Sequence, residues 1–199
     1  MFCATGYFSH IPLHAAGTAR EGCYTYFVPS YTPTLGALLT AQNKFSSTPR
    51  ENLQTVLAAV PVPFKWNRLY ATIAEVNLLR DLLPCGTTTC IPLEPSLKNS
   101  PLGSASSAAV FESLPKANIL HLACHGYYHP TNPLASGFVM HNKMLTVAEL
   151  LKHNLPHAFL AFLSACETAR ATQDQPDQAV HLAAAMMFAG FKSVIGTLW

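Results

Sequence analysis

An α/β fold with a largely parallel central sheet is predicted by three features of this sequence. Half of the 199 residues are hydrophobic and only 11% are charged, so the chain can bury a sizeable core. Short apolar runs at 55–60, 119–126 and 161–168 are bounded by loop residues, as is typical of the buried strands of a parallel sheet. Helical patterns separate these runs, and alternating strands and helices define the α/β class.

The first half of the chain predicts strands and helices in alternation. Aromatic and β-branched residues dominate 24–28, which with 5–13 is expected to form an opening pair of strands. Apolar residues recur at helical spacing from Leu69 to Leu83, and Pro84 ends that pattern, so an amphipathic helix is expected there. The other elements expected in this half are a helix at 34–44 and strands at 55–60 and 87–91.

The second half contains clearer boundary signals. Thr146 and Glu149 have the spacing of a capping box, in which each side chain satisfies a backbone N–H of the other residue at a helix start, so a helix is expected to about Asn154. The apolar stretch 180–189 predicts a buried helix, and Gly190 is expected to cap it. Further predicted elements are a helix at 104–114 and strands at 137–140 and 193–198.

Two of the apolar runs end at reactive side chains. His125 ends one predicted strand and is followed by Gly126, and Cys166 ends a later one. Ligands of open parallel sheets bind beyond the carboxyl ends of the strands, so neighbouring strands would bring the histidine and the cysteine together there. A thiol of pKa near ~8.5 is mostly protonated at neutral pH and needs such a base to become a nucleophile.

These motifs, taken in order, resemble those of the CHAT domain family, a caspase-like cysteine peptidase module. The resemblance covers nearly the whole chain, although the family pattern often has Asp-Glu where this chain has Asp177-Gln178. The matching segments are 11–17, 30–35, 121–126, 163–168 and 190–199.

The resemblance implies a caspase-like three-layer sandwich and a protein or peptide substrate, with no cofactor. It implies that His125 and Cys166 are catalytic and that the backbone N–H groups of Gly126 and Cys166 bind the oxyanion. Asp177, with Asp174 as its substitute, is a candidate for binding a basic side chain of the substrate, and Glu167 is a further pocket candidate.

The resemblance also bears on the rest of the protein. CHAT domains often follow tetratricopeptide repeats, so a repeat region is the expected partner in the full-length protein. Related domains continue past the last strand, so residues 1–199 are expected to be one CHAT domain that is truncated at its carboxyl end, after Trp199.

Two other functions stay open. The first is a catalytically inactive, caspase-like protein-interaction module. The second is a metal site built from His121, Cys124, His125 and His129, but strand side chains alternate, so Cys124 is expected to point away from His121 and His125. The spacing also matches no regular zinc finger, and no metal is therefore predicted.

Charge and cysteine content restrict the partners and the compartment. The formal net charge is +2 without a basic stripe, which disfavours nucleic acid as a partner. Six cysteines without a CxxC pair indicate free thiols in a reducing compartment, and no signal peptide is recognised, so a cytoplasmic location is expected. The apolar stretch from 179 to 199 is interrupted by His181, Gly190 and Lys192, so no membrane span is predicted.

Overall fold

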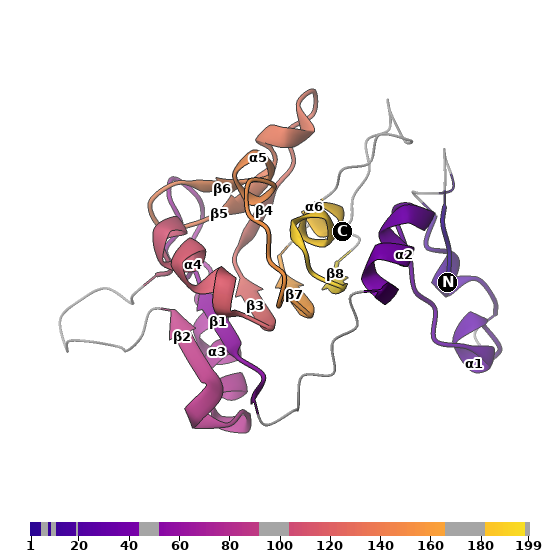
Figure 1. Ribbon diagram of the computed structural model, residues 1–199, viewed down its shortest axis with the longest axis horizontal. Coiled ribbons are helices and arrows are strands. Elements are labelled where there is room, and N and C mark those ends of the chain that lie inside the picture. The colour runs from indigo at the N-terminus through magenta and orange to yellow at the C-terminus, as the bar shows by residue number, and fades with distance from the viewer. Residues whose placement is uncertain are drawn as a thin grey trace.

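The computed structural model describes residues 1–4, 8, 11–18, 20–43, 52–91, 104–165 and 182–197. Strands and helices alternate along most of the chain (Figure 1). The helices are α1 (Cys23–Tyr26), α2 (Leu35–Asn43), α3 (Ala71–Leu82), α4 (Ser107–Ser113), α5 (Val147–Leu150) and α6 (Leu182–Ala189). The strands are β1 (Thr55–Ala59), β2 (Thr88–Ile91), β3 (Ile119–Ala123), β4 (His125–Tyr127), β5 (Gly137–Val139), β6 (Met144–Thr146), β7 (Leu160–Ser164) and β8 (Ser193–Gly196).

A five-stranded sheet forms the centre of the molecule, in the order β2-β1-β3-β7-β8. Every neighbouring pair in this sheet is parallel. The α/β prediction is therefore confirmed, and the strands expected at 55–60, 87–91 and 193–198 are present with slightly shorter bounds.

Helices cover both faces of this sheet, which makes a three-layer α/β sandwich of the caspase-like kind. On one face, Val76 of α3 packs against Leu57 and Ala59 of β1. The opposite face contributes Leu120 and Leu122 of β3 to the main core, which also contains buried residues of α4, α5 and α6. Burial on both faces explains why the central strands are almost wholly apolar.

A second, smaller sheet begins where β3 stops. The sequence predicted one strand up to His125, but β3 ends at Ala123 and His125 starts β4, which pairs with β5 and β6 in an antiparallel sheet. Two hydrogen bonds close the parallel ladder at this point, from Val60 N to Ala123 O (2.9 Å) and from Cys124 N to Ser164 O (3.2 Å). His125 therefore lies at the junction of the two sheets.

The capping box of α5 is present as predicted. The Thr146 hydroxyl accepts from Glu149 N at 3.2 Å, and Glu149 Oε2 accepts from Thr146 N at 3.0 Å. The helix itself ends at Leu150 rather than near Asn154. Gly190, predicted to cap α6, has φ of 131° and lies so close to Leu155 O that a Cβ would approach it to 2.5 Å.

The amino-terminal segments differ from the prediction. Residues 24–28 were expected to be a strand, but Cys23–Tyr26 is a short helix, closed by a hydrogen bond from Phe27 N to Cys23 O at 3.1 Å. No described strand lies alongside to supply ladder partners, so the backbone satisfies its polar groups locally. The strand expected at 5–13 lies partly outside the described residues, and its last residue belongs to the 3-10 helix Leu13–Ala15.

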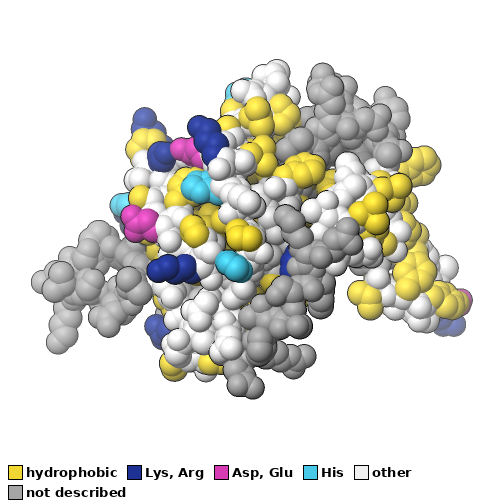
Figure 2. Space-filling view, in the orientation of Figure 1, with side chains coloured by type: hydrophobic (Ala, Val, Ile, Leu, Met, Phe, Trp, Pro, Cys, Tyr) yellow, Lys and Arg dark blue, Asp and Glu magenta, His cyan; other side chains and the backbone are white. Residues whose placement is uncertain are grey.

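These segments also expose many apolar side chains, which gather at the right of Figure 2. The exposed aromatic and aliphatic residues there include Tyr24, Tyr26, Phe27, Val28, Leu35 and Leu39. Within this part, the His14 ring Nδ1 lies 2.8 Å from the Tyr31 hydroxyl. This contact fits the structural role that a histidine in an opening loop would have.

Candidate functional site

The carboxyl ends of β3 and β7 lie side by side. The two strands are parallel neighbours in register, with Ala123 opposite Ser164. His125 follows the end of β3, and Ala165 follows the end of β7, where its carbonyl accepts a 2.7 Å hydrogen bond from the Thr197 hydroxyl. The chain thus brings one catalytic candidate and the residue preceding the other to neighbouring strand ends.

His125 is half-buried, and one of its ring nitrogens has a backbone partner. Its Nε2 lies 2.9 Å from the carbonyl oxygen of Asn67. A carbonyl oxygen only accepts, so Nε2 must carry the hydrogen in this bond. The neutral ring then has its lone pair on Nδ1, and that nitrogen is the one able to accept a proton.

The loop between β1 and α3 forms a wall beside this histidine. The Trp66 ring lies 5.2 Å from the His125 ring and 6.0 Å from the Tyr127 ring, measured between centroids. Hydrogen bonds from Phe64 N to Met140 O and from Leu69 N to Pro61 O, both 2.9 Å, hold the loop.

The sequence reasoning did not identify this loop as part of the site. The strand predicted at 55–60 is closely followed by an aromatic and cationic run, 64–70. That run lies just beyond the carboxyl end of a predicted parallel strand. Its place in the sequence was therefore a usable signal.

Most of the remaining candidates lie outside the described residues. Cys166, Glu167, Asp174 and Asp177 all belong to 166–181, of which the structure describes nothing. Gly126 is described, and it lies in β4 directly after His125, opposite Phe138 of β5.

The residues of the alternative metal site have separate partners. Cys124 is buried in the main core, on the face opposite His121, as strand alternation predicted. His129 accepts a 3.1 Å hydrogen bond from Asn132 N through Nδ1, so it organises its own loop. Among the described residues, no three His, Cys, Asp or Glu side chains are grouped closely enough to hold a metal ion.

His121 belongs to a polar cluster beneath α3. Its Nε2 lies 3.0 Å from Glu75 Oε1, without the alignment of a hydrogen bond, while Glu75 Oε2 accepts from the Ser164 hydroxyl at 3.1 Å. The Phe162 ring stacks on the imidazole at 5.1 Å. Burial lowers the pKa of His121 below its usual value of 6.5, and the nearby Glu75 carboxylate opposes that shift only in part.

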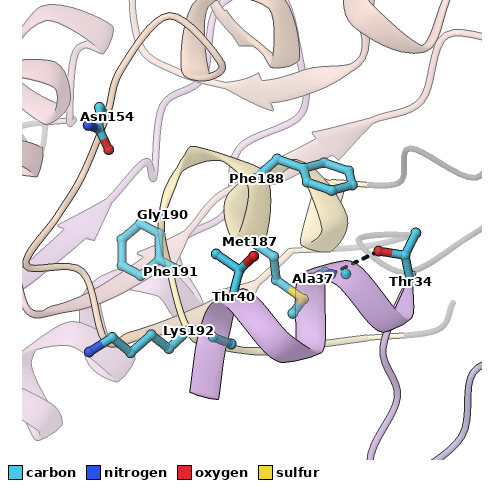
Figure 3. Close-up of a pocket in the computed structure, with 11 residues that line it drawn as sticks. Thr34, Ala37, Thr40, Asn154, Met187, Phe188, Gly190, Phe191 and Lys192 are labelled. Carbon is cyan, nitrogen blue, oxygen red and sulfur yellow. Dashed lines mark hydrogen bonds between the residues drawn. The ribbon is translucent and has the colours of Figure 1, made fainter. Parts of the chain in front are cut away.

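A cavity of about 350 Å³ lies elsewhere, between α2 and the end of α6 (Figure 3). Thr40 of α2 faces Met187 and Phe191 there, and Thr34 uses its hydroxyl to accept from Ala37 N at 3.0 Å. No histidine, cysteine or carboxylate lines this cavity among the described residues, and its one charged lining residue is Lys192. The strand ends at His125 remain the candidate site.

Comparison with known proteins identifies the family. The CHAT domain family model matches residues 2–199, which is nearly the whole chain. No individual curated protein matches it. CHAT domains are related to the caspase-like peptidases and are often fused to repeat regions. In this chain, no helix among the described residues is long and apolar enough to cross a membrane. With its parallel sheet, its two helical layers and a histidine at the carboxyl end of β3, this chain belongs to the CHAT domain family.

Proposed function

We propose that the chain is a cysteine endopeptidase that uses Cys166 as nucleophile and His125 as general base and acid. The observation that carries this proposal is the hydrogen bond between His125 Nε2 and Asn67 O, because it fixes the tautomer in which Nδ1 carries the basic lone pair. The parallel pairing of β3 and β7 supports it, since the strands that precede the two residues are neighbours.

The reaction follows the chemistry of a thiol nucleophile. Nδ1 of His125 takes the Cys166 proton, and the thiolate attacks the scissile carbonyl carbon to give a tetrahedral oxyanion. The backbone N–H groups of Gly126 and Cys166 stabilise that oxyanion. As the C–N bond breaks, His125 returns the proton to the leaving amine, and water then hydrolyses the acyl thioester to regenerate the thiol.

The remaining expectations belong to this proposal. Asp177, with Asp174 as its substitute, is the proposed partner of a Lys or Arg before the scissile bond, and Glu167 is a further proposed pocket residue. The reaction requires no cofactor or metal. Free thiols at Cys3, Cys23, Cys85 and Cys90 suit a reducing compartment such as the cytoplasm.

An acyloxymethyl ketone probe with a variable first residue tests the nucleophile and the pocket together. We expect labelling of the wild-type chain with preference for Arg or Lys, no labelling of Cys166→Ala, and a weaker basic preference in Asp177→Asn. Cys85→Ala is the matched control, because this cysteine is also free and is exposed. Labelling that survives in Cys166→Ala would refute the mechanism, and an unlabelled wild-type chain would favour an inactive interaction module.

A further inference from the structure

We infer that Glu75 is a positioning residue for His125, acting through the Asn67 carbonyl. The inference rests on the proposed function, because it assigns a role in preparing the general base. Glu75 does not approach His125 itself. It connects the helix that follows Asn67 to the two strands whose ends form the candidate site.

The first step is the set of contacts that Glu75 makes from α3. One carboxylate oxygen lies 3.0 Å from Nε2 of His121 in β3, and the other accepts from the Ser164 hydroxyl of β7 at 3.1 Å. His121 precedes His125 by four residues, and Ser164 precedes Cys166 by two. A single side chain thus joins α3 to both strands just before the points where they end.

The second step is the path from Glu75 to Asn67. Glu75 lies in the second turn of α3, which begins at Ala71. A hydrogen-bonded turn precedes this helix: the backbone N–H and the hydroxyl of Thr72 both donate to Leu69 O, at 3.1 and 2.7 Å. Asn67 is therefore only two residues from a turn that is hydrogen-bonded to the helix, and a shift of α3 relative to the sheet would displace its carbonyl from His125.

The third step concerns the free energy that is lost by holding the Glu75 carboxylate beside a neutral histidine. The His121 side chain is 7% exposed, and burial favours its neutral form, so it offers Glu75 little compensating charge. An apolar pair at this helix–sheet contact would avoid the desolvation of the carboxylate. The other charged side chains described in α3, Arg80 and Asp81, pair with each other at 3.2 Å and do not reach the sheet cluster. Glu75, whose side chain is 35% exposed, differs from them because both of its carboxylate oxygens contact the sheet.

The test follows the tautomer of His125 by long-range ¹H–¹⁵N correlation NMR of the full chain at neutral pH. In the wild type we expect the Nε2–H form. In Glu75→Ala, loss of the fixed Asn67 carbonyl should mix the two tautomers, and alkylation of Cys166 by iodoacetamide should slow by roughly tenfold to a hundredfold, as expected for a base misplaced by about 1 Å. Glu75→Gln keeps an oxygen for the Ser164 hydroxyl and should stay within about twofold of wild type.

Asp81→Ala is the matched control, since it removes a carboxylate from the same helix at an exposed position and should change neither readout. Should Glu75→Ala fail to fold, Ser164→Ala removes one of the two contacts of Glu75 and should shift the tautomer and the alkylation rate in the same direction but less far. A folded Glu75→Ala with an unchanged tautomer and alkylation rate would overturn the inference. If wild-type Cys166 reacts no faster than an ordinary thiol, the proposed function fails, and the NMR result still decides the role of Glu75.

Discussion

His121 and His125 are four residues apart but belong to different regions of the molecule. His121 is buried beneath α3, stacked on Phe162 and beside a carboxylate. His125 is half-buried at the carboxyl edge of the sheet, where one nitrogen meets a backbone carbonyl and the ring lies beside Trp66.

The comparison shows how position along one strand decides what a histidine can do. In the middle of β3 both sheet faces are covered, so burial favours the neutral form of the imidazole, and its ring packs on Phe162. Two residues beyond the strand end, His125 begins a second sheet, where its ring lies beside Trp66 and meets the Asn67 carbonyl. A histidine that must take and return a proton needs the second setting.

The largest expected effect concerns activity. His125→Ala should lower peptide hydrolysis by about 10²- to 10⁴-fold, because the general base is lost. The free energy of unfolding should fall by only about 0.5–1.5 kcal/mol, because the half-buried ring loses one hydrogen bond to Asn67 O. Turnover of a probe substrate and urea unfolding measure the two quantities. His157→Ala, a change at an exposed histidine, is the control, and equal activity in both variants would remove His125 from the mechanism.

The second effect is on stability. His121→Ala should destabilise the fold by about 1–3 kcal/mol, because it deletes the stack on Phe162 and leaves Glu75 with the Ser164 hydroxyl alone. Urea unfolding should show the loss. His121→Phe retains an aromatic ring and should be milder than His121→Ala. If the two variants are equally stable, the stack contributes nothing.

The smallest effect is a pH dependence of stability. The pKa of His121 is lowered in the folded chain, so below about pH 6.5 the unfolded chain binds more protons at this site than the folded chain does. The free energy of unfolding therefore decreases as the pH is lowered from about 6.5 to the folded pKa. Urea unfolding midpoints measured between pH 8 and 5 should therefore depend less on pH in His121→Phe than in the wild type. His125→Ala should keep the wild-type dependence on pH. The same pH profile in both variants would contradict the assignment.

The sequence was informative wherever a signal is local. Apolar runs predicted β1, β3, β7 and β8 because strands covered on both faces have no polar side to show. Thr146 and Glu149 predicted the start of α5, since a capping box involves only residues within one turn. The prediction failed for Cys23–Tyr26, where aromatic residues indicated a strand but no partner strand is present. Strand formation depends on partners distant in sequence, whereas a helical turn does not.

The sequence by itself determined the α/β class, the family and the choice of His125 as a catalytic candidate, because these depend on motifs that are continuous along the chain. The tertiary structure alone decided that Asn67 holds the His125 tautomer and that Glu75 joins β3 to β7, because these partners lie 58 and 89 residues apart in their pairs. It also decided that β3 ends at Ala123, since strand ends are set by the neighbouring strands. Contacts between distant segments have no periodicity in the sequence, and only the folded chain brings them together.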